Sequence, residues 1–180
     1  MDKTGIRRYM RGCETAFYEQ EGLPESESAL IWSKVEALQE FSDASTVLVY
    51  MSMKGEPATA GFIDRWHTRK RLVIPLVRGQ RLELREYSPD ALVKGYKGIV
   101  EPSESAPLVS ESAIDLAIVP GIAFAPSENG FLRLGHGGGF YDRLLPLLDC
   151  PTVGVCFSFR VLDRIPSESW DCSVGRLITP

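Results

Sequence analysis

Residues Arg133 to Leu145, RLGHGGGFYDRLL, contain four glycines within five positions, followed by an aromatic pair, Asp142 and Arg143. Glycine allows positive φ angles and lets another group approach the main chain closely. A phosphate held by backbone N–H groups is the commonest use of such a stretch, above all where a helix begins. The stretch therefore predicts an anion-binding loop, with a flexible turn as the alternative.

This glycine stretch fits neither of the two standard nucleotide-binding motifs. A Walker loop requires a lysine followed by serine or threonine after the glycines, and neither follows here. A dinucleotide fingerprint requires a third glycine where Phe140 stands, and a strand that runs straight into the turn. The glycine stretch alone therefore does not identify the anion, which must be inferred from other parts of the chain.

The composition predicts an ordinary globular protein. The chain has 180 residues, of which 44% are hydrophobic and 24% charged, and we expect one domain over residues 1–180. Acidic residues outnumber basic ones by 24 to 20, so a broad basic surface for nucleic acid is not expected. No segment approaches the ~20 apolar residues of a membrane helix, and the first residues lack the apolar core of a signal peptide. We expect a cytoplasmic protein without a nucleic-acid or membrane partner, and the sequence indicates no protein partner.

The cysteines do not suggest a metal site or a disulfide framework. They form no CxxC pair and have no histidine nearby at metal-site spacing. A catalytic cysteine is disfavoured because neither histidine of the chain has an evident pairing with one. We expect reduced, mostly buried thiols at all four positions: Cys13, Cys150, Cys156 and Cys172.

The elements that would position the glycine stretch follow from hydrophobic periodicity. Helices are expected over residues 3–20, from Pro24 to about Leu38, over 58–69, and over 139–148 with Pro146 shortening the last. Buried strands are expected at 45–51, 72–77, 114–120, 152–157 and 175–179. The alternating run 81–87 suggests a hairpin partner for the strand before it, whereas 88–112 and 121–131 are expected to be loops.

This alternation predicts an α/β fold, a single three-layer αβα domain with a mainly parallel sheet. Strand–helix–strand units pair their strands in parallel with a right-handed crossover. Ligands of such sheets bind beyond the carboxyl ends of the strands. The glycine stretch follows the strand at 114–120, so we expect it at that edge of the sheet.

The segment VPGIAFAPSENGFLRLGHGGGFYDRLL, residues 119–145, closely resembles the signature of the 5-formyltetrahydrofolate cyclo-ligase family. Four shorter matches occur in the family's order: a KxxxR pair at Lys3 and Arg7, MSMKGEPAT at 51–59, GIVEP at 98–102 and WDCSVGRLIT at 170–179. The chain departs from the family pattern at four positions: Ala125, His136, Phe140 and Gly175. Phe140 replaces a tyrosine, so no hydroxyl is available there.

The resemblance implies a fold similar to the sugar-phosphate isomerase/CoA transferase-like fold. It also implies ATP-dependent conversion of 5-formyltetrahydrofolate to 5,10-methenyltetrahydrofolate, with Mg²⁺ and release of ADP and phosphate. By resemblance, the ATP-binding residues are Lys3, Arg7, Arg133, Leu134, Gly135, His136, Gly137, Gly138, Gly139, Phe140 and Tyr141. The implied folate contacts are Met51 and Glu56, and the implied metal ligands are Asp142 and Asp171.

Simpler roles remain open for several of these residues. Lys3 and Arg7 stand at i and i+4, which is also the pattern of a solvated helix face. Met51 could be a core residue and Glu56 a solvated one. Asp142 could pair with Arg143 or with a helix N-terminus, and His136 could be structural or solvated.

Two other classes of function also remain open. One is a sugar-phosphate isomerase or CoA transferase, since their fold is similar, and neither of these uses ATP and Mg²⁺. The other is a non-catalytic protein that binds a folate or a nucleotide. A test of nucleotide-dependent turnover separates both from a cyclo-ligase.

Overall fold

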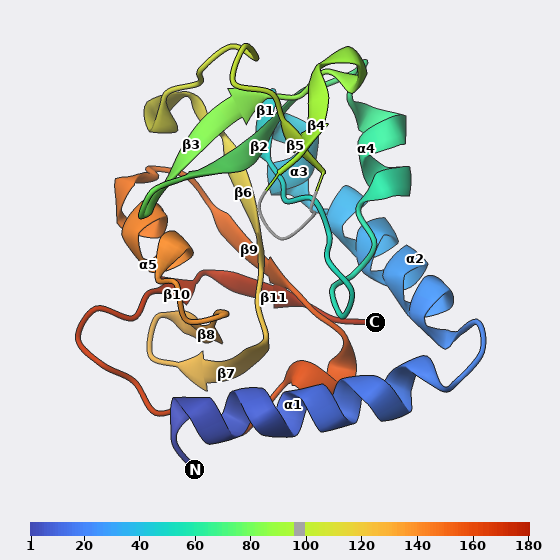
Figure 1. Cartoon of the computed structure of the whole chain (residues 1–180), viewed down its shortest axis with the longest axis vertical. Helices are drawn as coiled ribbons and strands as arrows, with labels where there is room; N and C mark the ends of the chain where they lie inside the picture. Colours follow the sequence, from blue (N-terminus) through green and yellow to red (C-terminus); the bar gives the residue numbers. More distant parts are fainter. Residues whose placement is uncertain (96–99) are drawn as a thin grey trace.

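The computed structural model describes residues 1–95 and 100–180, and its centre is a six-stranded sheet (Figure 1). The strand order is β11–β9–β6–β1–β2–β3. The strands are β1 (Thr46–Leu48), β2 (Arg71–Arg78), β3 (Arg81–Glu86), β6 (Leu116–Pro120), β9 (Thr152–Val155) and β11 (Arg176–Ile178). All neighbours pair in parallel except β2 and β3, which form the expected hairpin. The α/β class and the mainly parallel sheet are therefore confirmed.

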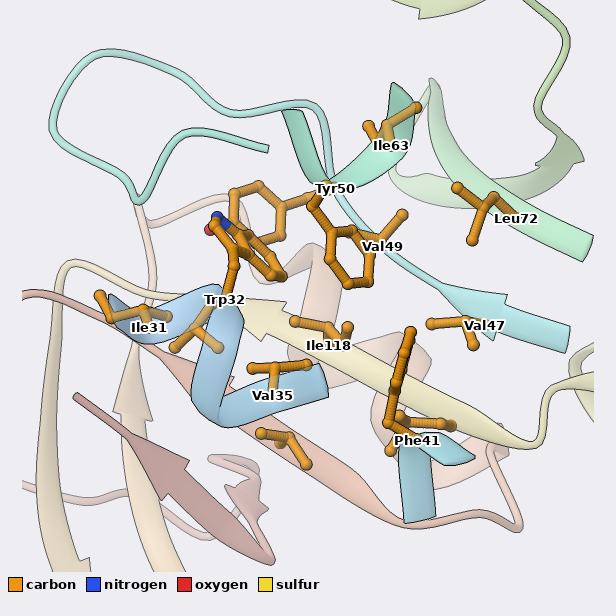
Figure 2. Close-up of a cluster of buried hydrophobic side chains, with 14 of the residues drawn as sticks. Ile31, Trp32, Val35, Phe41, Val47, Val49, Tyr50, Ile63, Leu72 and Ile118 are labelled. Carbon is orange, nitrogen blue, oxygen red and sulfur yellow. The ribbon is translucent and has the colours of Figure 1, made fainter. Parts of the chain in front are cut away.

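Helices cover both faces of this sheet because side chains alternate along the buried strands. Val47 and Ile118 face α2 (Leu23–Glu36), α3 (Gln39–Asp43) and α4 (Ala60–Trp66) in one cluster (Figure 2). On the opposite face, Leu48 and Val119 share a cluster with Leu144 of α5 (Phe140–Leu144). Figure 1 shows α5 and the α2–α4 pair on opposite sides of the sheet, as the sequence led us to expect.

The first helix, α1 (Lys3–Tyr18), packs on a second, smaller sheet. This sheet has the order β10–β8–β7, with β7 (Ala123–Ser127), β8 (Gly130–Leu134) and β10 (Ser173–Val174). Ile6 and Met10 are buried against it, and Asp2 caps the helix by accepting a hydrogen bond from the N–H of Gly5 at 2.7 Å. The contact fixes the start of α1 beside the strand that leads into the glycine stretch.

Two of the predicted loops contain strands. Residues 121–131 contain β7 and the start of β8, which form an antiparallel hairpin; Gly130, the first residue of β8, has φ +118°. The segment is rich in Pro, Ser, Asn and Gly, which are typical of loops. Here they belong to a hairpin that is stabilised by pairing with the distant β10. Within 88–112, β4 (Leu92–Lys94) pairs with β5 (Val100–Pro102), and two 3₁₀ turns, η1 (Pro89–Ala91) and η3 (Glu111–Ala113), lie nearby. Both loop predictions were wrong in these parts.

The predicted helices are present, with shifted ends. α2 stops at Glu36, so Leu38 lies outside it and precedes α3. α4 begins two residues after its predicted start and ends three before its predicted end. α5 ends at Leu144, and Pro146 lies in the 3₁₀ turn η4 (Leu145–Leu147), as expected of a residue that cannot donate a helical hydrogen bond. A further 3₁₀ turn, η5 (Ser158–Arg160), follows β9.

The structure also bears on the cysteines and on membrane insertion. All four cysteines are free; Cys156 is buried, whereas the other three are partly exposed, contrary to the expectation of mostly buried thiols. Among the described residues, no helix has the length and apolar character that crossing a bilayer requires.

Candidate functional site

A cavity of ≈ 200 Å³ lies at the carboxyl ends of β1 and β6, where the topology places a ligand site. One wall is the segment after β1, with Tyr50, Met51, Met53 and Glu56. The facing wall is the glycine loop, which we define as Gly135–Gly139, together with its neighbours. The residues predicted for folate and for ATP therefore line the same cavity: Met51, Glu56, Arg133, Gly135, His136, Gly138, Gly139, Phe140 and Tyr141.

The glycine loop connects β8 to α5 and depends on glycine at two positions. Gly137 has φ +101° and Gly139 has φ +65°, which side-chain-bearing residues rarely adopt. Arg143 closes the loop by donating a hydrogen bond from Nη2 to the carbonyl of Gly138 at 2.7 Å. Arg7 Nε donates to the carbonyl of Gly135 at 2.9 Å, so α1 holds a cation directly against the loop.

Arg133 provides a second cation, buried below the loop. Its Nη1 donates to the carbonyl of Pro120 at 3.1 Å, and its Nη2 lies 3.6 Å from Asp142 Oδ1. The guanidinium lies 5.0 Å from the centre of the Tyr141 ring. Burial lowers the pKa of Arg133, and the charge of Asp142 acts in the opposite direction. Asp142 therefore interacts with Arg133, whereas Arg143 bonds to backbone carbonyls of Gln80 and Gly138.

Arg133, Asp142 and the neighbouring Tyr141 each have one buried polar atom without a partner in the part of the chain that the structure describes. Among the described residues, Arg133 Nε, the Tyr141 hydroxyl and Asp142 Oδ1 have no hydrogen-bond partner. Burial also raises the pKa of Tyr141 well above its usual value, so its hydroxyl stays protonated. Unsatisfied buried polar groups are unfavourable in a folded protein and concentrate where ligands bind.

Lys3 contacts the other end of the chain. Its ammonium donates to both carboxylate oxygens of Asp171, at 2.6 and 2.7 Å, and to Glu168 at 2.6 Å. Burial alone would lower the pKa of Lys3, but its hydrogen bonds to Asp171 and Glu168 raise the pKa overall. Only 19% of the Lys3 side chain is exposed, so it is not part of a freely solvated face.

The predicted metal ligands can be tested against what Mg²⁺ requires, namely one or two carboxylates completed by phosphate oxygens and water. The thiol of Cys172 donates to the carbonyl of Asp142 at 3.4 Å, so the segments carrying Asp142 and Asp171 are in contact. Asp142 Oδ1 is a buried acceptor without a hydrogen-bond donor in the described part of the chain. No cluster of three or more metal-ligating side chains occurs in residues 1–95 and 100–180. A two-carboxylate site completed by phosphate and water fits this donor set.

Glu56 is a buried carboxylate on the wall opposite the glycine loop. Its Oε2 accepts a hydrogen bond from the N–H of Met53 at 2.8 Å, which fixes the side chain. Its Oε1 lies 3.7 Å from His136 Nε2, and 7% of the side chain is exposed. Met51 lines the cavity and also packs against the core, so both roles considered for it apply.

The remaining predicted residues do not line the cavity. Leu134 is buried in the cluster beneath α1, so only its main chain is available to a ligand. The cavity lining does not include Lys3, Arg7, Asp142 or Asp171, nor Gly137 of the loop itself. The sequence analysis missed Tyr50 and Glu101, which do line it. Glu101 stands inside the matched segment GIVEP, which was a usable signal.

Comparisons with known proteins show the family and the fold of the chain. Residues 1–180 match the model of the 5-formyltetrahydrofolate cyclo-ligase family. A 5-formyltetrahydrofolate cyclo-ligase from Escherichia coli is 33% identical over 146 residues, covering 76% of this chain and 79% of its own length. The solved structure of an Aquifex aeolicus 5,10-methenyltetrahydrofolate synthetase has a TM-score of 0.86 and 32% identity, covering 99% of this chain and 89% of its own. A Mycoplasma pneumoniae 5,10-methenyltetrahydrofolate synthetase shares the fold at a TM-score of 0.79 and 22% identity, covering 99% of each chain.

Proposed function

The chain belongs to the 5-formyltetrahydrofolate cyclo-ligase family, and we propose that it uses ATP and Mg²⁺ to convert 5-formyltetrahydrofolate to 5,10-methenyltetrahydrofolate. The observation that carries the proposal is the shared cavity, whose walls are the segment with Met51 and Glu56 and the glycine loop. The reaction requires a folate and a nucleotide to meet, and the cavity joins the two halves of the site. The family match spans residues 1–180, which supports a single catalytic domain. The four free cysteines support a reducing compartment such as the cytoplasm.

The chemistry explains the need for ATP. A formamide carbon is a weak electrophile, and ring closure must expel its oxygen, which is a poor leaving group. The formyl oxygen attacks the γ-phosphorus, the bond to the bridging oxygen breaks, and ADP leaves. N10 then adds its electron pair to the activated carbon, the C–O bond breaks, phosphate departs, and the N10 proton passes to water or phosphate. The protein's part is to align the two substrates and to offset the charge of phosphoryl transfer.

The nucleotide phosphates would bind around the glycine loop. Arg7 already touches the carbonyl of Gly135, and the buried Arg133 adds a second cation beneath the loop. Backbone N–H groups of consecutive glycines supply donors that match phosphate oxygens. This charge would stabilise negative oxygens during transfer without requiring the site to reorganise.

The folate would bind against the opposite wall. Glu56 Oε1 is free of the Met53 hydrogen bond and can accept hydrogen bonds from N–H groups of the pterin. Apolar side chains of Val77, Leu82 and Met51 supply contact surface for the flat ring in the same cavity. The two walls would bring the formyl group to the glycine loop.

Asp142 and Asp171 would hold Mg²⁺. When bound, the ion would offset negative charge on the phosphate oxygens. Asp142 Oδ1 lies 3.6 Å from Arg133 Nη2, and Asp171 accepts hydrogen bonds from Lys3.

The test is to incubate the purified protein with 5-formyltetrahydrofolate, ATP and Mg²⁺ and to measure methenyl product, ADP and phosphate. We expect one ADP per product and no turnover when ATP is omitted or replaced by an analogue that cannot transfer its γ-phosphate. Equal product formation without a nucleotide would contradict the proposal. Binding of both ligands without product would favour a non-catalytic binding protein.

A further inference from the structure

Arg160 is a buried arginine outside the cavity with no role assigned so far. Only 4% of its side chain is exposed, and the guanidinium lies 4.9 Å from the centre of the Phe159 ring. All three of its nitrogens donate hydrogen bonds. Nε donates to the carbonyl of Gly55 at 2.9 Å, Nη1 to the carbonyl of Ile122 at 2.8 Å, and Nη2 to Glu14 Oε2 at 2.7 Å.

Arg160 and its three partners come from four separate parts of the fold. Arg160 follows β9, Ile122 follows β6 and Gly55 follows β1, and these three strands are neighbours in the sheet. The arginine thus connects the carboxyl ends of three parallel strands at the edge that carries the cavity. Its third partner, Glu14, lies on α1, the helix that also carries Lys3 and Arg7. A buried arginine paired and hydrogen-bonded in this way has one available geometry.

The contact with Arg160 requires glycine at position 55. It has φ +91°, and a Cβ atom placed on it would lie 2.6 Å from Arg160 Nη2 and would also collide with Glu14. The next residue is Glu56, the carboxylate proposed to bind the pterin. Gly55 N–H also donates to the Tyr18 hydroxyl at 3.1 Å, so both main-chain groups of Gly55 are fixed by side chains from other elements.

We propose that Arg160, with Glu14, is a positioning residue that sets Glu56 in place for the folate substrate. The inference deepens the proposed function and rests on it. Arg160 fixes the carbonyl immediately before Glu56, whereas the glycine loop makes no hydrogen bond to it among the described residues. Losing Arg160 should therefore disturb the folate wall of the cavity more than the phosphate wall.

The experiment compares Arg160→Met, Arg160→Lys and Glu14→Gln with the wild type. KM for 5-formyltetrahydrofolate and KM for ATP are measured separately, with hydrogen exchange of the peptide covering residues 51–59. Arg65→Met is the matched control, because Arg65 pairs with Glu36 on α2 and is 53% exposed. Glu14→Gln keeps both Arg160 bonds to backbone carbonyls, so it provides a folded variant if Arg160→Met does not fold.

We expect Arg160→Met to raise KM for the folate by about 10- to 100-fold, since misplacing a binding group by roughly 1 Å has effects of this size. KM for ATP should change less than about threefold, and exchange should quicken in residues 51–59. Arg160→Lys should recover part of the folate KM, Glu14→Gln should show a smaller loss, and Arg65→Met should match the wild type. Equal rises in both KM values, or unchanged values in a folded Arg160→Met or Glu14→Gln, would overturn the inference. If the wild type shows no turnover, the proposed function fails, and unchanged exchange in residues 51–59 would separately refute the positioning role.

Discussion

Replacing Glu56 with glutamine tests which half of the cavity binds the folate. The substitution keeps the shape of the side chain and an oxygen for the Met53 N–H, but it removes the negative charge and replaces the other oxygen, an acceptor, with an NH₂ donor. The carboxylate is 7% exposed, so little water is available to compensate for a lost partner. A hydrogen bond to a buried charged group contributes about 1.5–3 kcal/mol. Because each 1.4 kcal/mol is a factor of ten, KM for 5-formyltetrahydrofolate should rise about 10- to 150-fold.

The same variant should leave ATP binding nearly unchanged. Steady-state kinetics with each substrate varied in turn, and calorimetric titration of ATP, would measure both affinities. Glu40→Gln is the control, because Glu40 pairs with the half-exposed Arg176 away from the cavity and should have no effect on either KM. If Glu56→Gln weakened ATP binding and left the folate KM unaltered, Glu56 would belong to the nucleotide half, and the assignment of the two walls would be wrong.

Three further predictions concern the metal, the glycine loop and a buried thiol. Asp142→Asn and Asp171→Asn should each lower turnover and shift its Mg²⁺ dependence to higher concentration, with the double variant losing less than the sum; additive losses at unchanged Mg²⁺ dependence would exclude a common ion. Gly137→Ala should lower the free energy of unfolding by about 1–2 kcal/mol and raise KM for ATP, because φ is +101° there; Gly12→Ala, in open space on α1, should do neither. Burial raises the pKa of Cys156 to about 12, so the thiol is protonated at pH 8 and should resist iodoacetamide in the native protein but react after denaturation. Rapid native alkylation of Cys156 would show that it is accessible as a thiolate.

The sequence predicted the central sheet well because its strands are unbroken apolar runs. Val47, Leu116 and Val153 are fully or almost fully buried, and such runs can only be buried strands or core helices. The hairpin of β7 and β8 was missed because its stability comes from partners far along the chain. Its inner residues Ala123 and Ala125 are small, and they are buried only because α1 packs over them.

The candidate site was predictable where it depends on the local backbone conformation. The glycine loop was visible because positive φ angles restrict the residue type at Gly137 and Gly139. Arg160 was invisible because its role depends on three carbonyl and carboxylate partners that lie 38 to 146 positions away. A single arginine outside the predicted helices and strands has no pattern in the sequence that separates it from a solvated one.

Two of the cations predicted to bind phosphate are paired with the proposed metal ligands, and this pairing indicates which ligand they suit. Lys3 pairs with Asp171 and Arg133 with Asp142, so two of the three cations predicted to bind phosphate lie against a proposed metal ligand, whereas Arg7 bonds to the carbonyl of Gly135. A free triphosphate would be attracted by both cations and repelled by both carboxylates. A free divalent cation would be attracted by both carboxylates and repelled by both cations. A metal–triphosphate complex offers each of the four side chains a group of opposite sign. For this reason we expect the aspartate variants to change the Mg²⁺ dependence of turnover, whereas loss of Glu56 should act on the folate alone.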